Sequence, residues 1–390
     1  MAETVAVLER EVADLQRDLA AALTLAQEVQ LREALTRTEL TGALTSVLAA
    51  RAQAQARLRA EGARNYFRNA PRRGVRPRGA RFDRLLLSLR SFGQALLVAR
   101  TGVWRSSGRP GADLRHIAAY ARRGPIAETV PSTLLDQAWY IETYPDVATS
   151  GLAPLVHYLA AGVADGRSPH PLFNGEWYRS ANAGALPAGV SPLEHFLSIG
   201  AAEGRNPHPL FDVTYYAGQS PELSPGEDPV SHYMREGWRQ NLSPHPLFDP
   251  LWYRAQMPRR AAGTPPFLHY VTTGAAERLS PHALFDPAWY LERNPDVAAT
   301  GADPLTHFMA AGAAEGRDPS PWFDIAAYAA LRGDALPPDA NPLVDYLQGG
   351  AWALVEARPG VPLPAYLATH PDLVHDGLTP LEHWARQERG

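Results

Sequence analysis

The chain has 390 residues, a formal net charge of −4 and no cysteine. The absence of cysteine excludes a disulfide framework, a cysteine metal site and a cysteine nucleophile. No run of 18 or more uncharged apolar residues occurs, so no membrane-spanning helix is expected. The N-terminus lacks a basic stretch and carries Glu3 and Glu9 early, which argues against a signal peptide. The expected location is therefore the cytoplasm, with peripheral contact at the inner membrane as a variant.

Charge is distributed unevenly along the chain. Residues 51–123 contain 18 arginines against three acidic residues, whereas residues 134–390 contain 15 arginines against 29 acidic residues. A basic segment beside a long acidic region indicates contacts with charged partners. The sequence suggests three parts: a coiled coil over 1–50, an arginine-rich linker with a basic amphipathic helix over 51–133, and a repeat array over 134–390.

The N-terminal part carries a heptad pattern. Its apolar residues recur at alternating spacings of three and four, at Val5, Leu8, Val12, Leu15, Leu19, Ala22, Ala26 and Val29. This spacing predicts a coiled coil through which the protein associates with itself as a dimer or trimer. The alternative is one long helix that folds back on its own chain.

A cationic segment follows the heptads. Residues 51–80 are rich in arginine, proline and glycine, as in a linker, and residues 81–105 combine leucines with Arg81, Arg84, Arg90 and Arg100. A basic amphipathic helix of this kind is expected to contact an anionic membrane or another anionic partner. The alternative is a helix that packs on the first repeat and caps the array. Nucleic acid is a less favoured partner, because no recognition motif accompanies the charge.

Residues 134–390 repeat with a period of 37 or 38 residues. One marker of the period is a tyrosine, at Tyr140, Tyr178, Tyr216, Tyr253, Tyr290, Tyr328 and Tyr366. The second marker is a histidine, at His157, His195, His232, His269, His307 and His383, with Asp345 in the sixth position. Two markers that keep one period predict about seven repeats.

Each repeat reads as two short helices, which makes the expected fold class all-α. The first helix follows an N-cap such as Asp249, Asp286 or Asp324. The second opens at pairs such as Ser191-Pro192, Asp228-Pro229, Asp303-Pro304, Asn341-Pro342 and Thr379-Pro380. It is expected to end near a left-handed glycine, such as Gly162, Gly200, Gly237, Gly274, Gly312 or Gly349. Helices this short need their neighbours, so the repeats should stack.

Histidines form two columns in the repeats. The first column consists of the histidine markers named above, and the second comprises His170, His208, His245 and His282. Histidine is a common metal ligand, but a metal site needs several ligands around one ion. Equivalent histidines of neighbouring repeats are expected to lie too far apart to bind one metal ion together. We therefore expect structural histidines that bond backbone groups of the loops, and no metal or other cofactor.

Aromatic side chains precede the tyrosine marker in five repeats. These candidate ligand-binding residues are Trp139, Trp177, Tyr215, Trp252 and Trp289. Adjacent residues on a helix point about 100° apart, so one ring of each pair should be buried and the other partly exposed. A row of exposed rings would suit sugar stacking.

Two further motifs read as structural turns. Asp146, Asp296 and Asp372 follow a proline and are expected to cap a short third helix. Turns such as Glu203-Gly204-Arg205 should contain a left-handed glycine, with the arginine paired to an aspartate of the next repeat.

Catalytic motifs are missing from the sequence. It contains no glycine-rich phosphate loop, no Gly-x-Ser-x-Gly and no His-Glu-x-x-His. We therefore expect a protein that is not an enzyme.

The repeat resembles one found in proteobacterial proteins. The resemblance is carried by Phe285-Asp286-x-x-x-Tyr290, Asn294-Pro295-Asp296-Val297, Pro304-Leu305-x-His307-Phe308 and Gly312-x-x-Glu315-Gly316-Arg317-x-Pro319. In many of those proteins the repeat is joined to glycosyltransferase domains linked to surface polysaccharide synthesis, often behind a coiled coil. The resemblance implies a scaffold or binding protein in that process, with glycosyltransferase or export machinery as partner. The alternatives are a direct glycan-binding protein or adhesin, and a fragment of a glycosyltransferase-related or metal-dependent enzyme.

Overall fold

The computed structural model of the protein describes residues 5–17, 37–69, 90–104, 108–127, 129–220, 223–224, 227–349, 366, 370, 373 and 378–389. Within these residues the chain is helical, and extended pairing is limited to isolated bridges in tight loops, such as His170 with Phe173. The expected all-α class is confirmed for this part of the chain. None of its helices is both long and apolar enough to pass through a bilayer.

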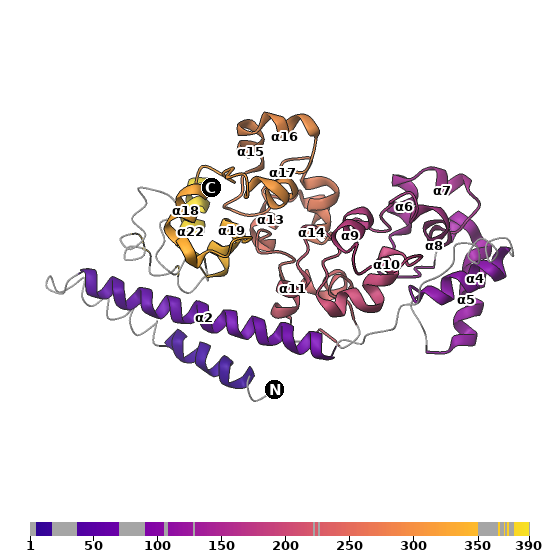
Figure 1. Ribbon diagram of the computed structural model, residues 1–390, viewed down its shortest axis with the longest axis horizontal. Helices are drawn as coiled ribbons and strands as arrows, with labels where there is room; N and C mark the ends of the chain where they lie inside the picture. Colours follow the sequence, from indigo (N-terminus) through magenta and orange to yellow (C-terminus); the bar gives the residue numbers. More distant parts are fainter. Residues whose placement is uncertain are drawn as a thin grey trace. The chain divides into compact units, whose positions relative to one another are not determined.

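The chain divides into two compact units, one of residues 66–244 and one of residues 1–65 with 245–390. The first contains α4 (Arg90–Thr101), α5 (Pro110–Arg123), α6 (Gln137–Thr143), α7 (Asp146–Thr149), α8 (Pro154–His157), α9 (Gly175–Ala181), α10 (Pro192–His195), α11 (Val213–Gln219) and α12 (Pro229–His232). The second contains α2 (Arg37–Asn69, up to residue 65), α13 (Pro250–Gln256), α14 (Pro266–His269), α15 (Pro287–Arg293), α16 (Pro295–Thr300), α17 (Pro304–His307), α18 (Ile325–Arg332), α19 (Pro342–Gln348) and α22 (Pro380–Arg389) (Figure 1). The division cuts the repeats after Pro244, whereas the sequence suggests a boundary near residue 134.

The described residues also contain short π-helical and 3₁₀-helical segments. Five π-helical segments follow second helices: η2 (Tyr158–Gly162), η3 (Phe196–Gly200), η5 (Tyr233–Gly237), η7 (Tyr270–Gly274) and η8 (Phe308–Gly312). Four 3₁₀ turns are η1 (Gly124–Ile126), η4 (Ala201–Glu203), η6 (Arg259–Ala261) and η9 (Gly333–Ala335).

Side-chain caps start the helices of the repeats. The side chains of Asp136, Asn174, Asp212, Asp249, Asp286 and Asp324 accept backbone N–H groups in the first turn of the first helix. Ser191, Asp228, Asp303 and Asn341 cap the second helix in the same way, and each is followed by proline. The caps predicted at Asp249, Asp286 and Asp324, and before the prolines of the second helix, are confirmed. Each cap satisfies donors that a helix cannot satisfy internally.

The two markers of the sequence period are bonded to each other. In six repeats the tyrosine hydroxyl lies 2.8–3.2 Å from Nδ1 of the histidine 16 or 17 residues later, as in Tyr178 with His195. This Tyr–His pair joins the first helix of a repeat to the second. Tyr140, Tyr178, Tyr216, Tyr253 and Tyr290 are fully buried, so the pair satisfies a hydroxyl that water cannot reach.

The sixth repeat keeps the contact with different chemistry. Tyr328 donates to Asp345 Oδ2 at 2.5 Å in place of a histidine. Arg332 pairs with the same carboxylate at 2.7 Å, so the half-buried negative charge is neutralised. The substitution of aspartate for histidine is thus matched by an arginine 13 residues earlier.

The glycine after the second helix is required for space and not for a left-handed backbone. A Cβ at Gly162, Gly200, Gly237, Gly274 or Gly312 would lie 1.8–2.3 Å from the hydroxyl of the paired tyrosine. The expectation of left-handed glycines at these positions is wrong, because none of the five has a positive φ. Left-handed glycines occur at the following turn, at Gly166, Gly204 and Gly316.

A backbone bond closes five of the described repeats. The N–H of five first-helix N-cap residues donates to a proline carbonyl 32 or 33 residues later, at the end of the same repeat, as in Asp136 to Pro169 at 3.1 Å and Asp249 to Pro281 at 2.9 Å. The same bond occurs at Asn174, Asp212 and Asp286. Between repeats, the Tyr270 hydroxyl donates to Asp303 Oδ1 at 2.7 Å, which joins the fourth repeat to the fifth.

Helices α4 and α5 precede the first repeat in the 66–244 unit and pack on each other. Ala95, Leu97 and Val98 of α4 are buried, and α4 also contacts α8. Tyr120 of α5 accepts a hydrogen bond from the Leu155 N–H at 2.9 Å. Part of the apolar face of α4 is thus covered by protein, as the capping alternative predicts, while Phe92 is 59% exposed.

The residues proposed for membrane contact are only partly visible. Arg81 and Arg84 lie outside the described residues, and Arg90 begins α4 without a described side chain. Arg100, in the last turn of α4, is exposed.

The N-terminal helix lies beside α2. The helix of residues 5–17 runs along α2 (Figure 1), and Glu11 lies 3.9 Å from Arg57. Leu8 and Leu15 of the heptad pattern are half-buried. The later heptad positions, from residue 19 to 29, lie outside the described residues.

The close approach of the tyrosine hydroxyl to the glycine, here called the steric lock, can be tested by a double substitution. We expect Gly200→Ala to lower the free energy of unfolding by about 1–3 kcal/mol, because its Cβ would lie 2.1 Å from the Tyr178 hydroxyl. Tyr178→Phe removes that oxygen, so the double variant should be more stable than Gly200→Ala alone. Denaturant titration measures all three. Gly184→Ala, which meets no atom within 4 Å, is the control. Additive losses in the double variant would contradict the lock.

Candidate interaction site

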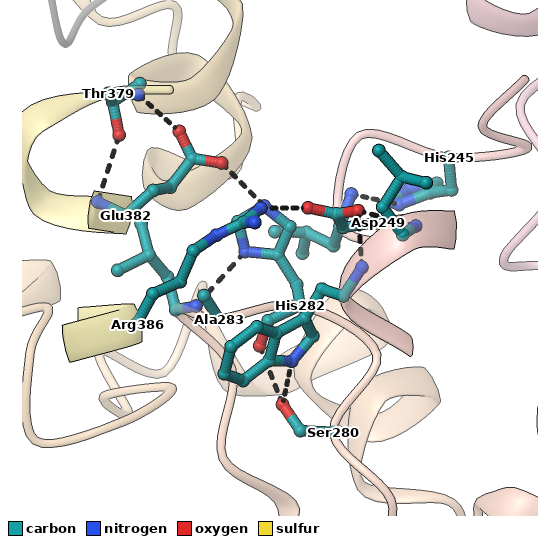
Figure 2. A network of polar contacts seen from close by, with 12 residues as sticks. His245, Asp249, Ser280, His282, Ala283, Thr379, Glu382 and Arg386 are labelled. Carbon is teal, nitrogen blue, oxygen red and sulfur yellow. Dashed lines mark hydrogen bonds and ion pairs between the residues drawn. The ribbon is translucent and has the colours of Figure 1, made fainter. Parts of the chain in front are cut away.

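The C-terminal helix α22 folds back onto loops that start α13 and α15, more than 90 residues earlier in the chain. Figure 2 shows this contact, in which Glu382 and Arg386 of α22 point at His282 and Asp249. All of these residues belong to one compact unit. The contact joins two ion pairs and a His282–Glu382 hydrogen bond between segments far apart in sequence, and we treat it as the candidate functional site.

Two N-cap aspartates form the acidic part of the site. Asp249 Oδ1 accepts the Trp252 N–H at 2.9 Å, while its Oδ2 binds Arg386. Asp286 Oδ1 accepts the Trp289 N–H at 3.0 Å, while its Oδ2 lies 3.1 Å from Arg389. Each carboxylate therefore caps its own helix with one oxygen and holds an arginine of α22 with the other.

His282 lies between the two aspartates in sequence and binds α22 through its outer nitrogen. Its Nδ1 accepts the Leu284 N–H at 3.1 Å, so the ring proton is placed on Nε2. Nε2 lies 3.0 Å from Glu382 Oε1 and donates to it. Both side chains are nearly buried, at 4% and 10% exposure. We call Asp249, His282 and Asp286 the α22 seat.

Glu382 serves two purposes in α22. Its Oε2 accepts the Thr379 N–H at 2.8 Å, and the Thr379 hydroxyl accepts the Glu382 N–H at 3.2 Å. This reciprocal pair is a capping box, which confirms the predicted cap at Thr379. Burial raises the pKa of the Glu382 carboxyl, but hydrogen bonds from His282 and Thr379 outweigh burial, so the pKa lies below its usual value.

Arg389 fixes the end of α22 against two tryptophans. Its guanidinium donates to Ser280 Oγ at 3.0 Å and to the Ala283 carbonyl at 3.1 Å. It also lies 5.4 Å from the ring of Trp252 and 5.1 Å from that of Trp322. Stacking of arginine on tryptophan adds attraction to the ion pair with Asp286.

The aromatic residues proposed for ligand binding lie on the first helices of successive repeats. Trp139, Trp177, Tyr215, Trp252 and Trp289 are half-buried, while the tyrosine that follows each is buried. Two of these rings are covered by arginine: Trp252 by Arg386 and Arg389 at 5.4–5.6 Å, and Trp289 by Arg293 at 5.2 Å. The Trp252 ring is thus already occupied by α22.

The first histidine column bonds a tyrosine side chain through Nδ1, while His195 also has the expected hydrogen bond to loop backbone, at Ala185. Nδ1 of His157, His195, His232, His269, His307 and His383 bonds the tyrosine of the same repeat. Burial lowers the pKa of His157 and His195, which favours the neutral ring. Among the described residues no group of three potential ligands could hold a metal ion.

The second histidine column does bond loop backbone. Nδ1 of His170, His208, His245 and His282 accepts the N–H two residues later at 3.0–3.1 Å. Ser320 replaces histidine in the next repeat, and its Oγ accepts the Trp322 N–H at 3.3 Å. Burial lowers the pKa of His170 and of His208 to about 4. Protonation of Nδ1 would place its N–H opposite the backbone N–H that it now accepts, and the loss of this hydrogen bond would open the turn.

The arginine of the Glu-Gly-Arg turn pairs within its own repeat. Arg167 donates to Asp146 at 2.8 Å, and Arg317 donates to both oxygens of Asp296 at 2.8–2.9 Å. The expectation of a partner in the next repeat is wrong. Asp146 and Asp296 lie in the first turns of α7 and α16 but do not cap them, because their carboxylates face these arginines. Asp372 lies outside the described residues.

Sequence reasoning missed the α22 seat. Asp249 and His282 have clear local roles in the sequence. The residues around them do not indicate where a distant helix will dock. One signal was available. Glu382, Arg386 and Arg389 fall at i, i+4 and i+7, which places them on one face of a helix.

Comparison with protein-family models, with curated proteins and with solved structures gave no match for this chain.

The second histidine column makes stability depend on pH. An unfolded histidine takes up a proton below about pH 6.5, whereas His170 and His208 stay neutral in the folded state until about pH 4. Unfolding therefore takes up protons in this window, and stability falls as the pH drops from about 6.5 to about 4. Each histidine contributes a loss on the order of 3 kcal/mol.

His170→Ser copies Ser320 and keeps an acceptor for the backbone N–H without a titrating group. We expect urea titrations from pH 7 to pH 4.5 to show a shallower pH dependence for this variant than for the parent chain. His116→Ser, at an exposed position on α5, serves as the control. If the free energy of unfolding changed equally with pH in His170→Ser and in the parent chain, His170 would not be a source of the pH dependence.

Proposed function

We propose that this chain is a non-catalytic α-helical scaffold of about seven stacked repeats that associates with itself through an N-terminal coiled coil. It holds other proteins of bacterial cell-surface polysaccharide biosynthesis, such as a glycosyltransferase or export component. The alternatives are a direct glycan-binding protein or adhesin and an enzyme fragment.

One observation carries the scaffold proposal: a face of the repeats already seats a helix. Asp249, His282 and Asp286 hold α22 by three charged or hydrogen-bonded contacts of 3.1 Å or less. A surface that recognises a helix in this way suits a protein that binds other proteins.

The chemistry of the described repeats supports a structural role for the residues that recur. The tyrosine and first-column histidine bond each other, and the second-column histidine bonds its own loop. Burial lowers the pKa of His195 and raises that of Tyr178 above its ordinary value, so neither group exchanges protons readily near neutral pH. The link to polysaccharide biosynthesis rests on the resemblance of the repeat motif.

The proposal predicts a binding protein without turnover. We expect the purified full-length chain to leave nucleotide sugars unchanged, and to co-purify from its native cell with a glycosyltransferase or export protein. Calorimetric titration with surface-type oligosaccharides tests the glycan alternative. Saturable binding that is lost in Trp289→Ala but kept in Leu331→Ala, an exposed apolar control, would favour that alternative. Turnover of a nucleotide sugar by the chain alone would contradict the scaffold.

Self-association through the heptads is tested by one apolar substitution. At high dilution, we expect Leu15→Asp to reduce the mass measured by light scattering to that of the single 42.5 kDa chain, because a carboxylate would be buried in the seam. Gln16→Asp changes an exposed neighbour and should leave the assembly intact. An unchanged mass for Leu15→Asp would show that the heptads serve only the fold of one chain.

A further inference from the structure

The α22 seat is fixed by bonds that do not involve α22. Asp249 and Asp286 are held by the N-cap bonds from Trp252 and Trp289, and His282 is held by the Leu284 N–H. Each of the three leaves one polar atom for α22: Oδ2, Nε2 and Oδ2. Groups that are already oriented lose little conformational entropy when they bind a partner. The repeats thus present a pre-formed seat.

Helix α22 carries everything that the seat recognises. Glu382, Arg386 and Arg389 lie on one face, and the capping box between Thr379 and Glu382 starts the helix without help from the seat. Leu381 and Ala385 are buried as well. The recognised element is therefore a short continuous segment with a negative group followed by two positive groups.

The contact has the composition of an interface between protein chains. Two arginines cross to two aspartates, and Arg389 packs on Trp252 and Trp322. Arginine and tryptophan are enriched at the centres of protein–protein interfaces. The charge order is also complementary, because the two acidic groups of the seat face the two basic groups of the helix.

We propose that the α22 seat accepts α22 from a second copy of this chain, so that two copies become linked by exchange of this helix. A second copy brings the same segment that fits the seat. Exchange replaces each contact within a chain by an identical contact between chains. The equilibrium between single chains and exchanged dimers therefore depends on local concentration. The proposal names a partner for the scaffold and rests on that function.

The absence of cysteine makes exchange directly measurable. Leu251 on α13 is 59% exposed and Gln387 on α22 is exposed, and in sequence they closely follow Asp249 and Arg386, which are in contact. Full-length Leu251→Cys and full-length Gln387→Cys are mixed, incubated and treated with a short bis-maleimide. We expect a covalent dimer that contains one chain of each kind. The double variant Leu251→Cys/Gln387→Cys, diluted, should cross-link within one chain and so prove the proximity.

Charge reversal shows whether the dimer uses the seat. Adding Arg386→Asp to the Gln387→Cys chain should lower the yield of mixed dimer about tenfold or more, because aspartate would face Asp249. Adding Asp249→Arg to the Leu251→Cys chain should restore the yield. This variant also loses the α13 cap, so thermal unfolding is measured to confirm that it is folded at the working temperature.

Three results would overturn the proposal: cross-links confined to single chains, a mixed dimer that Arg386→Asp leaves unchanged, or a double variant without an internal cross-link. An unrelated helix as the true occupant would give the first of these results. Failure of exchange is distinguishable from failure of the scaffold, because co-purification with biosynthetic proteins and the light-scattering mass of Leu15→Asp are separate measurements.

Discussion

The hydrogen bond between a buried tyrosine and a histidine 16 or 17 residues later is the interaction on which each repeat depends. It joins two helices of seven and nine residues, as in α9 and the α10–η3 segment, which are too short to be stable alone. The glycine that follows makes room for the hydroxyl, since any Cβ there would overlap it. A buried hydroxyl without a partner would cost on the order of 1–3 kcal/mol per repeat. The sixth repeat shows that the constraint is on the bond and not on histidine, because Asp345 with Arg332 satisfies it too.

Some polar side chains of the repeats make two contacts, one within their own turn and one with α22. Asp249, His282 and Asp286 each use one atom to hold their own turn, which leaves a second atom for another contact. At Asp249, His282 and Asp286 these second atoms meet α22. A binding surface thus arises from groups that the fold already needs. Residues whose local role is structural thus also support the proposed scaffold function.

The sequence predicts the parts of this structure that depend on short-range rules. The period of Tyr178 and His195 predicts a repeat, and the residues before Pro192 and Pro287 predict helix starts, because capping depends on neighbours three residues away. The role of Gly200 is misread, since a glycine at a helix end commonly takes a left-handed backbone, whereas here a tyrosine 22 residues earlier needs the space. Arg317 and α22 are missed for the same reason. Their partners are set by how the helices stack, which spacing in one repeat does not encode.

The central claim is that the tyrosine and histidine of each repeat bond each other inside the protein. Proton NMR of the ¹⁵N-labelled chain at neutral pH tests this most directly at Tyr178, Tyr216 and Tyr253, whose rings are fully buried. The account predicts slowly exchanging protons between each phenol oxygen and Nδ1 of His195, His232 and His269, with nuclear Overhauser contacts between the paired rings. Protons that exchange at the rate of free side chains, or histidine rings without contact to tyrosine, would contradict it.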